Sequence, residues 1–236
     1  MSWSALQHTH RAVAGNTVRA GVLGANDGLV SNLSLVAGVA GAALQSRIVF
    51  ITGLAGLFAG AGAMAMGEWI SVQNSRELQT RELDVEAEEL ERFPREETAE
   101  LAGLYEAHGL PAAQARTLAE SVIADPRTAL GVMAREELGI DPDNLGGSPY
   151  KAAASSAALF CIGAIVPLVP FAVTTGARAL AASVAASALA LFLLGALVTR
   201  LTGRSALRSG LRQVLFGLGA AAVTYAIGRV VGLAVR

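Results

Sequence analysis

The sequence predicts an all-α integral membrane protein with five transmembrane helices and a helical domain inserted between spans two and three. Two observations lead to this fold class. Of the 236 residues, 53% are hydrophobic and only 16% are charged, whereas soluble domains carry about 25% charged residues. In addition, 17 of the 19 acidic residues lie between Glu77 and Asp143, so one acidic stretch separates two apolar parts of the chain.

Five apolar runs reach the length of about 20 residues that a helix needs to cross a bilayer core. These runs are residues 20–44, 48–70, 152–174, 179–201 and 214–235. Polar residues, among them Asp27 and Asn32, interrupt the first run. A helical period nevertheless places its apolar residues Leu29, Leu33 and Val36 away from the face that carries Asp27, so we retain it as a span.

The acidic stretch is expected to be helical throughout. No glycine or proline occurs between Gly67 and Pro94, so the second membrane helix should continue beyond the bilayer for about 23 residues, or about 35 Å. Prolines then divide the stretch into short helices near 95–108, 111–124 and 126–138. The chain therefore divides into residues 1–74 with spans one and two, 75–149 as the acidic helical domain, and 150–236 with spans three to five.

Arginine placement gives the expected orientation. Arg200, Arg204, Arg208 and Arg212 fall between the fourth and fifth runs, and short loops rich in Arg and Lys remain cytoplasmic. With five spans, the amino terminus and the acidic domain are then cytoplasmic as well. The Ala- and Gly-rich composition, in which arginine dominates and one lysine occurs, is typical of bacteria, so we expect a multi-pass protein of a bacterial plasma membrane.

Two features bear on partners. Residues 75–149 have a formal charge of −10, and the rest of the chain has +9, so the acidic domain would repel nucleic-acid phosphates and nucleic acid is not expected as a partner. Small residues spaced by four allow close packing of helices in lipid, which favours a homo-oligomer. The pairs are Gly24 with Gly28, Gly56 with Gly60, and Gly228 with Gly232.

The acidic domain also carries a candidate metal site. Three pairs of residues each share one face of a helix: Glu86 with Glu89, Glu97 with Glu100, and Met133 with Glu137. If these faces converge, their like charges need a cation to neutralise them. Carboxylates suit Mg²⁺, Ca²⁺ or Mn²⁺, and the thioether favours a softer transition metal. On spacing alone, a solvated acidic face with Met133 in the core is the usual alternative for Glu-rich helices.

Asp27 is the one acidic residue well inside a span, and such residues usually have a function. Met64 lies at a similar depth in the second span, and Glu68 follows one turn nearer the cytoplasm on the same face. The three side chains are therefore expected to line one path. For Met64 alone, a lipid-facing or core position is the simpler interpretation, and Glu68 would then extend to the membrane surface.

Three segments resemble the vacuolar iron transporter family: GANDGLVSNLSLVAGV at 24–39, MAMGEWISV at 64–72 and GAIVPL at 163–168. The order of two spans, a cytoplasmic helical domain and three further spans also matches that family. The resemblance implies a homodimer that exports Fe²⁺, and in some members Mn²⁺, from the cytoplasm in exchange for protons, with the path between subunits. It implies a transporter and not an enzyme, with the metal as cargo and bound ion and with no prosthetic group.

The resemblance also assigns residues. Asp27 and Met64 are similar to the intramembrane transport residues of the family. The three pairs in the acidic domain match its metal-binding residues: Glu86, Glu89, Glu97, Glu100, Met133 and Glu137. The working hypothesis is that the acidic domain collects Fe²⁺ and passes it to Glu68, Met64 and Asp27. A membrane-anchored metal sensor or store is the alternative, and a di-iron oxidase ranks last because the domain lacks Glu-x-x-His pairs.

Overall fold

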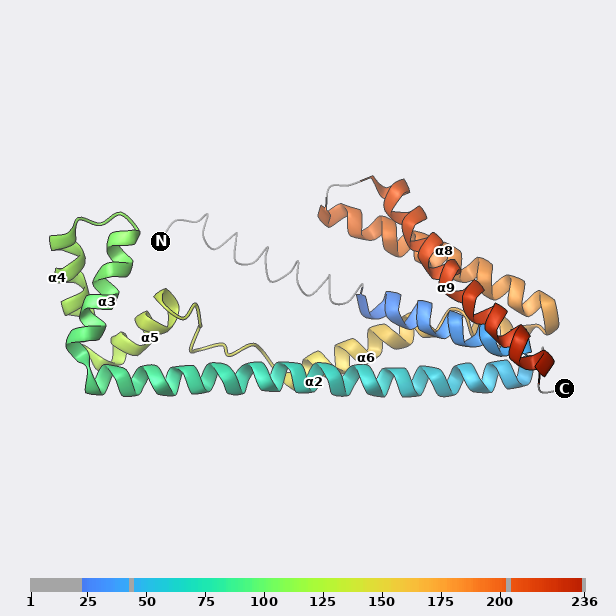
Figure 1. The fold of residues 1–236 in the computed structure, drawn as a ribbon, viewed down its shortest axis with the longest axis horizontal. Helices are drawn as coiled ribbons and strands as arrows, with labels where there is room; N and C mark the ends of the chain where they lie inside the picture. The colour runs from blue at the N-terminus through green and yellow to red at the C-terminus, as the bar shows by residue number, and fades with distance from the viewer. Residues whose placement is uncertain (1–22, 43–44, 203–204, 235–236) are drawn as a thin grey trace. The chain divides into compact units, whose positions relative to one another are not determined.

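The computed structural model describes residues 23–42, 45–202 and 205–234, and all regular elements within these ranges are α-helices. The chain divides into two compact units. Unit 1 comprises Met1–Glu68 and Tyr150–Arg236, and unit 2 is Trp69–Pro149. Helix α2, Ser46–Arg92, contributes its first part to unit 1 and its last part to unit 2 (Figure 1).

The helix over residues 23–42 is the most enclosed element of unit 1. Its apolar side chains Leu29, Leu33 and Val36 are fully buried, as the helical period predicts. The Thr224 hydroxyl of α9, Ala206–Ala234, donates a hydrogen bond of 2.7 Å to the backbone oxygen of Ser34. The predicted span 20–44 is thus helical over 23–42, and its two ends lie outside the described residues.

Glycines allow this helix to pack closely against its neighbours. A Cβ atom at Gly28 would collide with the backbone of Phe160 in α6, and one at Gly228 would collide with the backbone of Gly38. Small residues allow such close approach of helices in lipid. Both glycines belong to small-residue pairs that favoured a homo-oligomer, and both pack within the chain instead.

The predicted span 152–174 is broken in the structure. Helix α6 runs over Pro149–Ile165, and the short helix α7 over Val169–Val173. Pro167 lies in the turn between them, and proline has no N–H to continue a helix. At 17 residues, α6 alone is shorter than the length of about 20 residues that a span needs.

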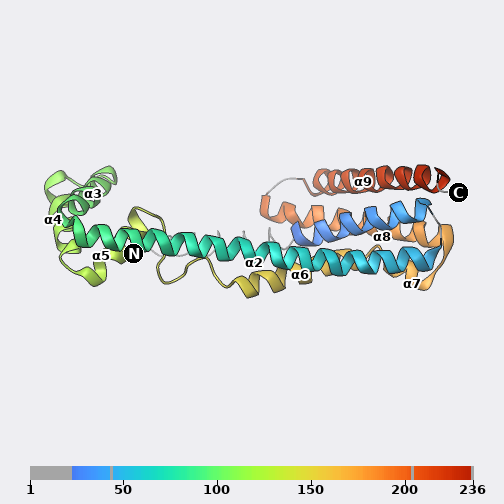
Figure 2. The same ribbon diagram turned by 60° about the horizontal axis from the view of Figure 1, so that its bottom comes forward.

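Three described helices are long and apolar enough to cross a membrane, namely α2, α8 at Gly176–Thr202, and α9. Helices α8 and α9 lie side by side in both views (Figures 1 and 2). They contain the predicted spans 179–201 and 214–235 almost completely. The other two of the five predicted spans are therefore not confirmed by helix length and composition.

Unit 2 consists of the end of α2 and three shorter helices: α3 at Pro94–Ala107, α4 at Ala112–Ile123 and α5 at Pro126–Glu136. Their bounds differ by two residues at most from the predicted ones, because prolines mark where helices begin. Helix α2 continues without a break to Arg92, as the absence of glycine and proline predicts. A small core of Leu101, Ala102, Ala119 and Met133 holds unit 2 together.

Candidate metal centre and membrane pocket

Three carboxylates from three elements of unit 2 meet at one point. Glu86 comes from α2, Glu97 from the first turn of α3, and Glu137 from the turn after α5. One carboxylate oxygen from each lies within 4.8 Å of the others. We call these three residues the acidic cluster. Oxygen atoms at this spacing have the separation and charge that suit a divalent cation.

The chain reversal between α2 and α3 places two of these residues. Pro94 cannot continue α2 and instead begins α3. The amide of Phe93 donates to the oxygen of Glu89 at 2.7 Å, and the amide of Glu97 donates to the oxygen of Phe93 at 3.1 Å. This tight reversal directs Glu97 back towards the last turns of α2, where Glu86 lies.

The end of α5 places the third carboxylate. The Glu137 amide donates to the Met133 oxygen at 2.9 Å, and the Ile140 amide donates to the Ala134 oxygen at 2.7 Å. Gly139 between them has a φ of 66°, the left-handed conformation that ends many helices and that glycine adopts without strain. The turn fixes the backbone of Glu137 at the edge of the core.

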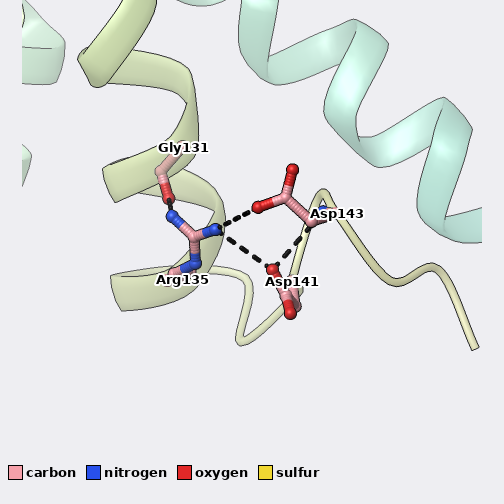
Figure 3. Close-up of polar contacts among 4 residues, drawn as sticks. All are labelled: Gly131, Arg135, Asp141 and Asp143. Atoms are coloured by element: carbon pink, nitrogen blue, oxygen red, sulfur yellow. Dashed lines mark hydrogen bonds and ion pairs between the residues drawn. The ribbon is translucent and has the colours of Figure 1, made fainter.

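Arg135 ties the following loop to α5 (Figure 3). Its guanidinium donates to Asp141 at 3.1 Å, to Asp143 at 2.9 Å and to the backbone oxygen of Gly131 at 3.1 Å. These side chains are exposed, so each ion pair contributes little by itself. Together they hold Asp141 and Asp143 against the end of α5 without using the carboxylates of the cluster.

The cluster is electrostatically strained without a cation. Burial, and then the charges of Glu137, Glu97, Glu89 and Glu100, raise the pKa of Glu86 from 4.5 to about 7. Burial and neighbouring carboxylates also raise the pKa values of Glu97 and Glu137. Glu86 is 2% exposed, and no described residue hydrogen-bonds its Oε1. A bound cation would offset the repulsion between the carboxylates and would give the buried Glu86 oxygen a partner.

The remaining predicted ligands surround this cluster in different ways. Glu89 and Glu100 are exposed, yet their charges act on the cluster, and Glu100 also hydrogen-bonds Glu137. Met133 is fully buried and belongs to the apolar core beside Leu101. The structure therefore brings the five predicted carboxylates into mutual electrostatic range and places the thioether within the core.

A second candidate site lies in unit 1. A pocket of about 290 Å³ between the helix over 23–42, α2 and α6 is lined by both Asp27 and Met64. Glu68 is half-buried and is not among the lining residues of this pocket. Two of the three predicted path residues thus share one pocket.

Asn32 also lines this pocket, and no sequence pattern assigns it a role. In the sequence it stands out only as a polar interruption of the first apolar run. A polar side chain buried in an apolar helix is itself a sign of an unusual environment. However, its hydrogen-bond partner Ala164 is 132 positions away, so spacing cannot reveal it.

Comparisons with known proteins agree on one family. The model of the VIT family matches residues 18–229. The chain is 31% identical to vacuolar iron transporter 2 of Oryza sativa subsp. japonica, over 95% of this chain and 92% of that protein. It is 31% identical to vacuolar iron transporter 1 of Arabidopsis thaliana, over 95% of this chain and 90% of that protein. It is 35% identical to vacuolar iron transporter homolog 5 of Oryza sativa subsp. japonica, over 92% of this chain and 82% of that protein. Because the family model and the relatives match most of its length, this chain belongs to the VIT family.

Proposed function

We propose that this protein exports divalent iron from the cytoplasm in exchange for protons, with Mn²⁺ as an alternative cargo. Membership of the VIT family supports metal transport, and the names of the relatives support iron. The observation that carries the proposal is the pocket of unit 1, which a carboxylate and a thioether both line. A thioether beside a carboxylate favours a transition metal over Mg²⁺ or Ca²⁺.

The acidic cluster gathers the cargo. A carboxyl group with a pKa of about 7 is partly protonated at neutral pH, so a cation displaces a proton when it binds. When the site is empty, a proton on Glu86 reduces the negative charge of the cluster. When metal binds, the cation replaces that proton. Glu68, between the two sites along α2, receives the ion before it reaches Met64 and Asp27.

Asp27 couples the ion to protons. A charged and empty carboxylate is costly in a medium of low dielectric constant, so Asp27 carries either the metal or a proton. Exchange of one for the other allows a proton gradient to drive the metal outward.

The topology in this proposal has five spans with the amino terminus and the acidic domain in the cytoplasm. The helix over 23–42 forms span one, and α6 with α7 forms a broken span three. Broken helices occur at membrane depth where protein covers the freed backbone groups. Here Asn32 and Ser183 donate to two carbonyl oxygens at the break. Composition favours a bacterial plasma membrane for this chain, whereas the names of its relatives refer to vacuoles.

A homodimer completes the path. Asp27 and Ser31 of the pocket are exposed in the single chain. A carboxylate that faces lipid is costly, and a second copy of the chain would cover this face. The pocket would then lie at the interface between subunits.

Fe²⁺ flux into proteoliposomes tests the proposal. Asp27→Asn keeps the size of the side chain and removes its titratable charge, so we expect flux to be lost. Metal binding by the acidic cluster, measured by calorimetry on the same protein, should remain. Flux that survives the substitution excludes Asp27 as the coupling site.

The acidic cluster alone favours a second function, that of a membrane-anchored metal sensor or store. All three of its carboxylates come from unit 2, so binding does not require the pocket. In that case the wild-type protein would bind Fe²⁺ with no flux, and Asp27→Asn would change neither measurement.

A further inference from the structure

The amide group of Asn32 has a fixed orientation. Its Nδ2 donates a hydrogen bond of 2.7 Å to the backbone oxygen of Ala164 in α6. Only the NH₂ side of an amide can donate to a carbonyl oxygen. The Oδ1 atom must therefore point away from α6.

The break between α6 and α7 creates this acceptor. In a continuous helix the oxygen of Ala164 would accept from the amide of Leu168. That amide instead donates to Ile165 at 2.9 Å, because Pro167 interrupts the helical pattern. The oxygen of Ala164 is left for Asn32, and the oxygen of Pro167 accepts from the hydroxyl of Ser183 at 2.7 Å.

The free oxygen of Asn32 faces α2. A Cβ atom added at Gly56 would lie 3.2 Å from Asn32 Oδ1, and both residues line the pocket that contains Asp27 and Met64. Asn32 is 2% exposed, and no described residue hydrogen-bonds its Oδ1. A buried oxygen without a partner is destabilising, so this one requires an explanation.

We propose that Asn32 Oδ1 is a neutral ligand for the metal cargo, held towards the pocket by the carbonyl oxygen that the α6–α7 break exposes. Amide oxygens are good ligands for divalent cations. The proposal rests on the transport function proposed above and adds a residue to its path. Leu35 lines the same pocket and lies beside Gly56.

The position and charge of Asn32 suggest when it acts. It lies five residues beyond Asp27, about 7.5 Å further along the helix axis and further from the cytoplasmic end. A neutral oxygen binds a cation less tightly than a carboxylate does. Asn32 therefore accepts the ion from Asp27, and releases it more readily than a second carboxylate would.

Co²⁺ flux into proteoliposomes made with full-length protein tests this role, with KM and kcat measured separately. Asn32→Leu removes the oxygen, and we expect kcat to fall about tenfold, the size of effect that loss of one group near a bound metal produces. Asn32→Asp can keep both contacts, because a protonated carboxyl donates to Ala164 and still presents an oxygen to the pocket. Its ionised form holds the ion more tightly, so both KM and kcat should fall.

Ser183→Ala is the matched control. It removes the other hydrogen bond to the same helix break, and Ser183 is not among the pocket residues. We expect Ser183→Ala to lower the Tm and to leave KM and kcat near their wild-type values.

The proposal is overturned if Asn32→Asp transports with wild-type KM and kcat, or if Asn32→Leu and Ser183→Ala lose flux in proportion to their loss of Tm. Either result makes Asn32 a structural hydrogen-bond donor alone. If Asn32→Leu does not fold, the KM and kcat of Asn32→Asp alone decide whether Asn32 is a ligand. If the wild-type protein moves neither Co²⁺ nor Fe²⁺ in the same vesicles, the transport function fails, and the role of Asn32 fails with it.

Discussion

Glu86 combines deep burial with four carboxylate neighbours, and these two causes raise its pKa to about 7. The folded protein therefore holds a proton on Glu86 more tightly than the unfolded chain does. In the metal-free protein, this contributes stability that is fully present below pH 4.5 and is lost as the pH rises through about 7. A bound cation has the opposite preference, because it requires the ionised form.

Metal binding should consequently depend steeply on pH. Below pH 7, the affinity of the full-length protein for Co²⁺ should fall by about tenfold per pH unit for each proton displaced. Calorimetry between about pH 5.5 and 8 in detergent would measure how the affinity for Co²⁺ changes with pH. This change reports the proton that the metal displaces. Glu86→Gln should flatten this pH dependence. Glu88→Gln is the control, since Glu88 lies on the same helix but is exposed and pairs with Arg92 at 2.7 Å. Equal slopes in the two variants would remove Glu86 from the site.

Met133 tests whether a buried thioether takes part in metal choice. It is fully buried in the core of unit 2 and lies one helical turn before Glu137. Leucine has a similar volume and helix propensity, so Met133→Leu should preserve the fold. We expect Co²⁺ binding to weaken relative to Mn²⁺, whereas Glu97→Gln should weaken both. Competition titrations would measure the ratio, and an unchanged ratio in Met133→Leu would make Met133 a core residue only.

The element that controls Glu137 is the end of α5. Gly139 adopts a φ of 66°, and the Ile140 amide closes the turn onto Ala134. This geometry fixes where the backbone of Glu137 leaves the helix. The acidic cluster therefore depends on a glycine that contributes no ligand.

Gly139→Ala should lower stability by about 1 kcal/mol, because alanine is strained in the left-handed region. We expect Co²⁺ affinity to fall as well, since Glu137 moves with the turn. Gly103→Ala is the control, because Gly103 lies within α3 with open space around it, and alanine there should be neutral or stabilising. The measurements are thermal unfolding and calorimetry. A Gly139→Ala protein with wild-type affinity would show that the turn does not position Glu137.

At the scale of elements, patterns of proline and glycine predicted most of unit 2. Pro94 and Pro126 begin helices where expected, and α2 continues as far as glycine and proline are absent. Residues 152–174 were instead predicted from hydropathy as one continuous span, and hydropathy does not register Pro167, where the structure interrupts the helix. The hydrogen bonds that stabilise this break come from Asn32 and Ser183, which are distant in sequence.

At the scale of the whole molecule, formal charge divides the chain into an acidic part and a basic, more apolar part. Residues 75–149 carry a formal charge of −10 and the rest of the chain carries +9, and the second compact unit begins at Trp69, near the start of this acidic part. Charge composition depends on sums over many residues, so the sequence alone is enough to locate the acidic part. The convergence of Glu86, Glu97 and Glu137 depends on tertiary packing. Residue spacing shows which side chains share a helix face, but the separation of no more than 4.8 Å between their oxygen atoms follows only from the structure.

Simultaneous measurement of Fe²⁺ and proton movement tests the central claim most directly. Full-length protein is reconstituted into vesicles that contain a pH dye, and Fe²⁺ is added outside with and without an acidic interior. The proposed exchange predicts that an acidic interior accelerates Fe²⁺ entry, that the interior becomes more alkaline as iron enters, and that Asp27→Asn removes both signals. Iron entry at the same rate with and without the gradient, with no change in internal pH, would contradict proton exchange.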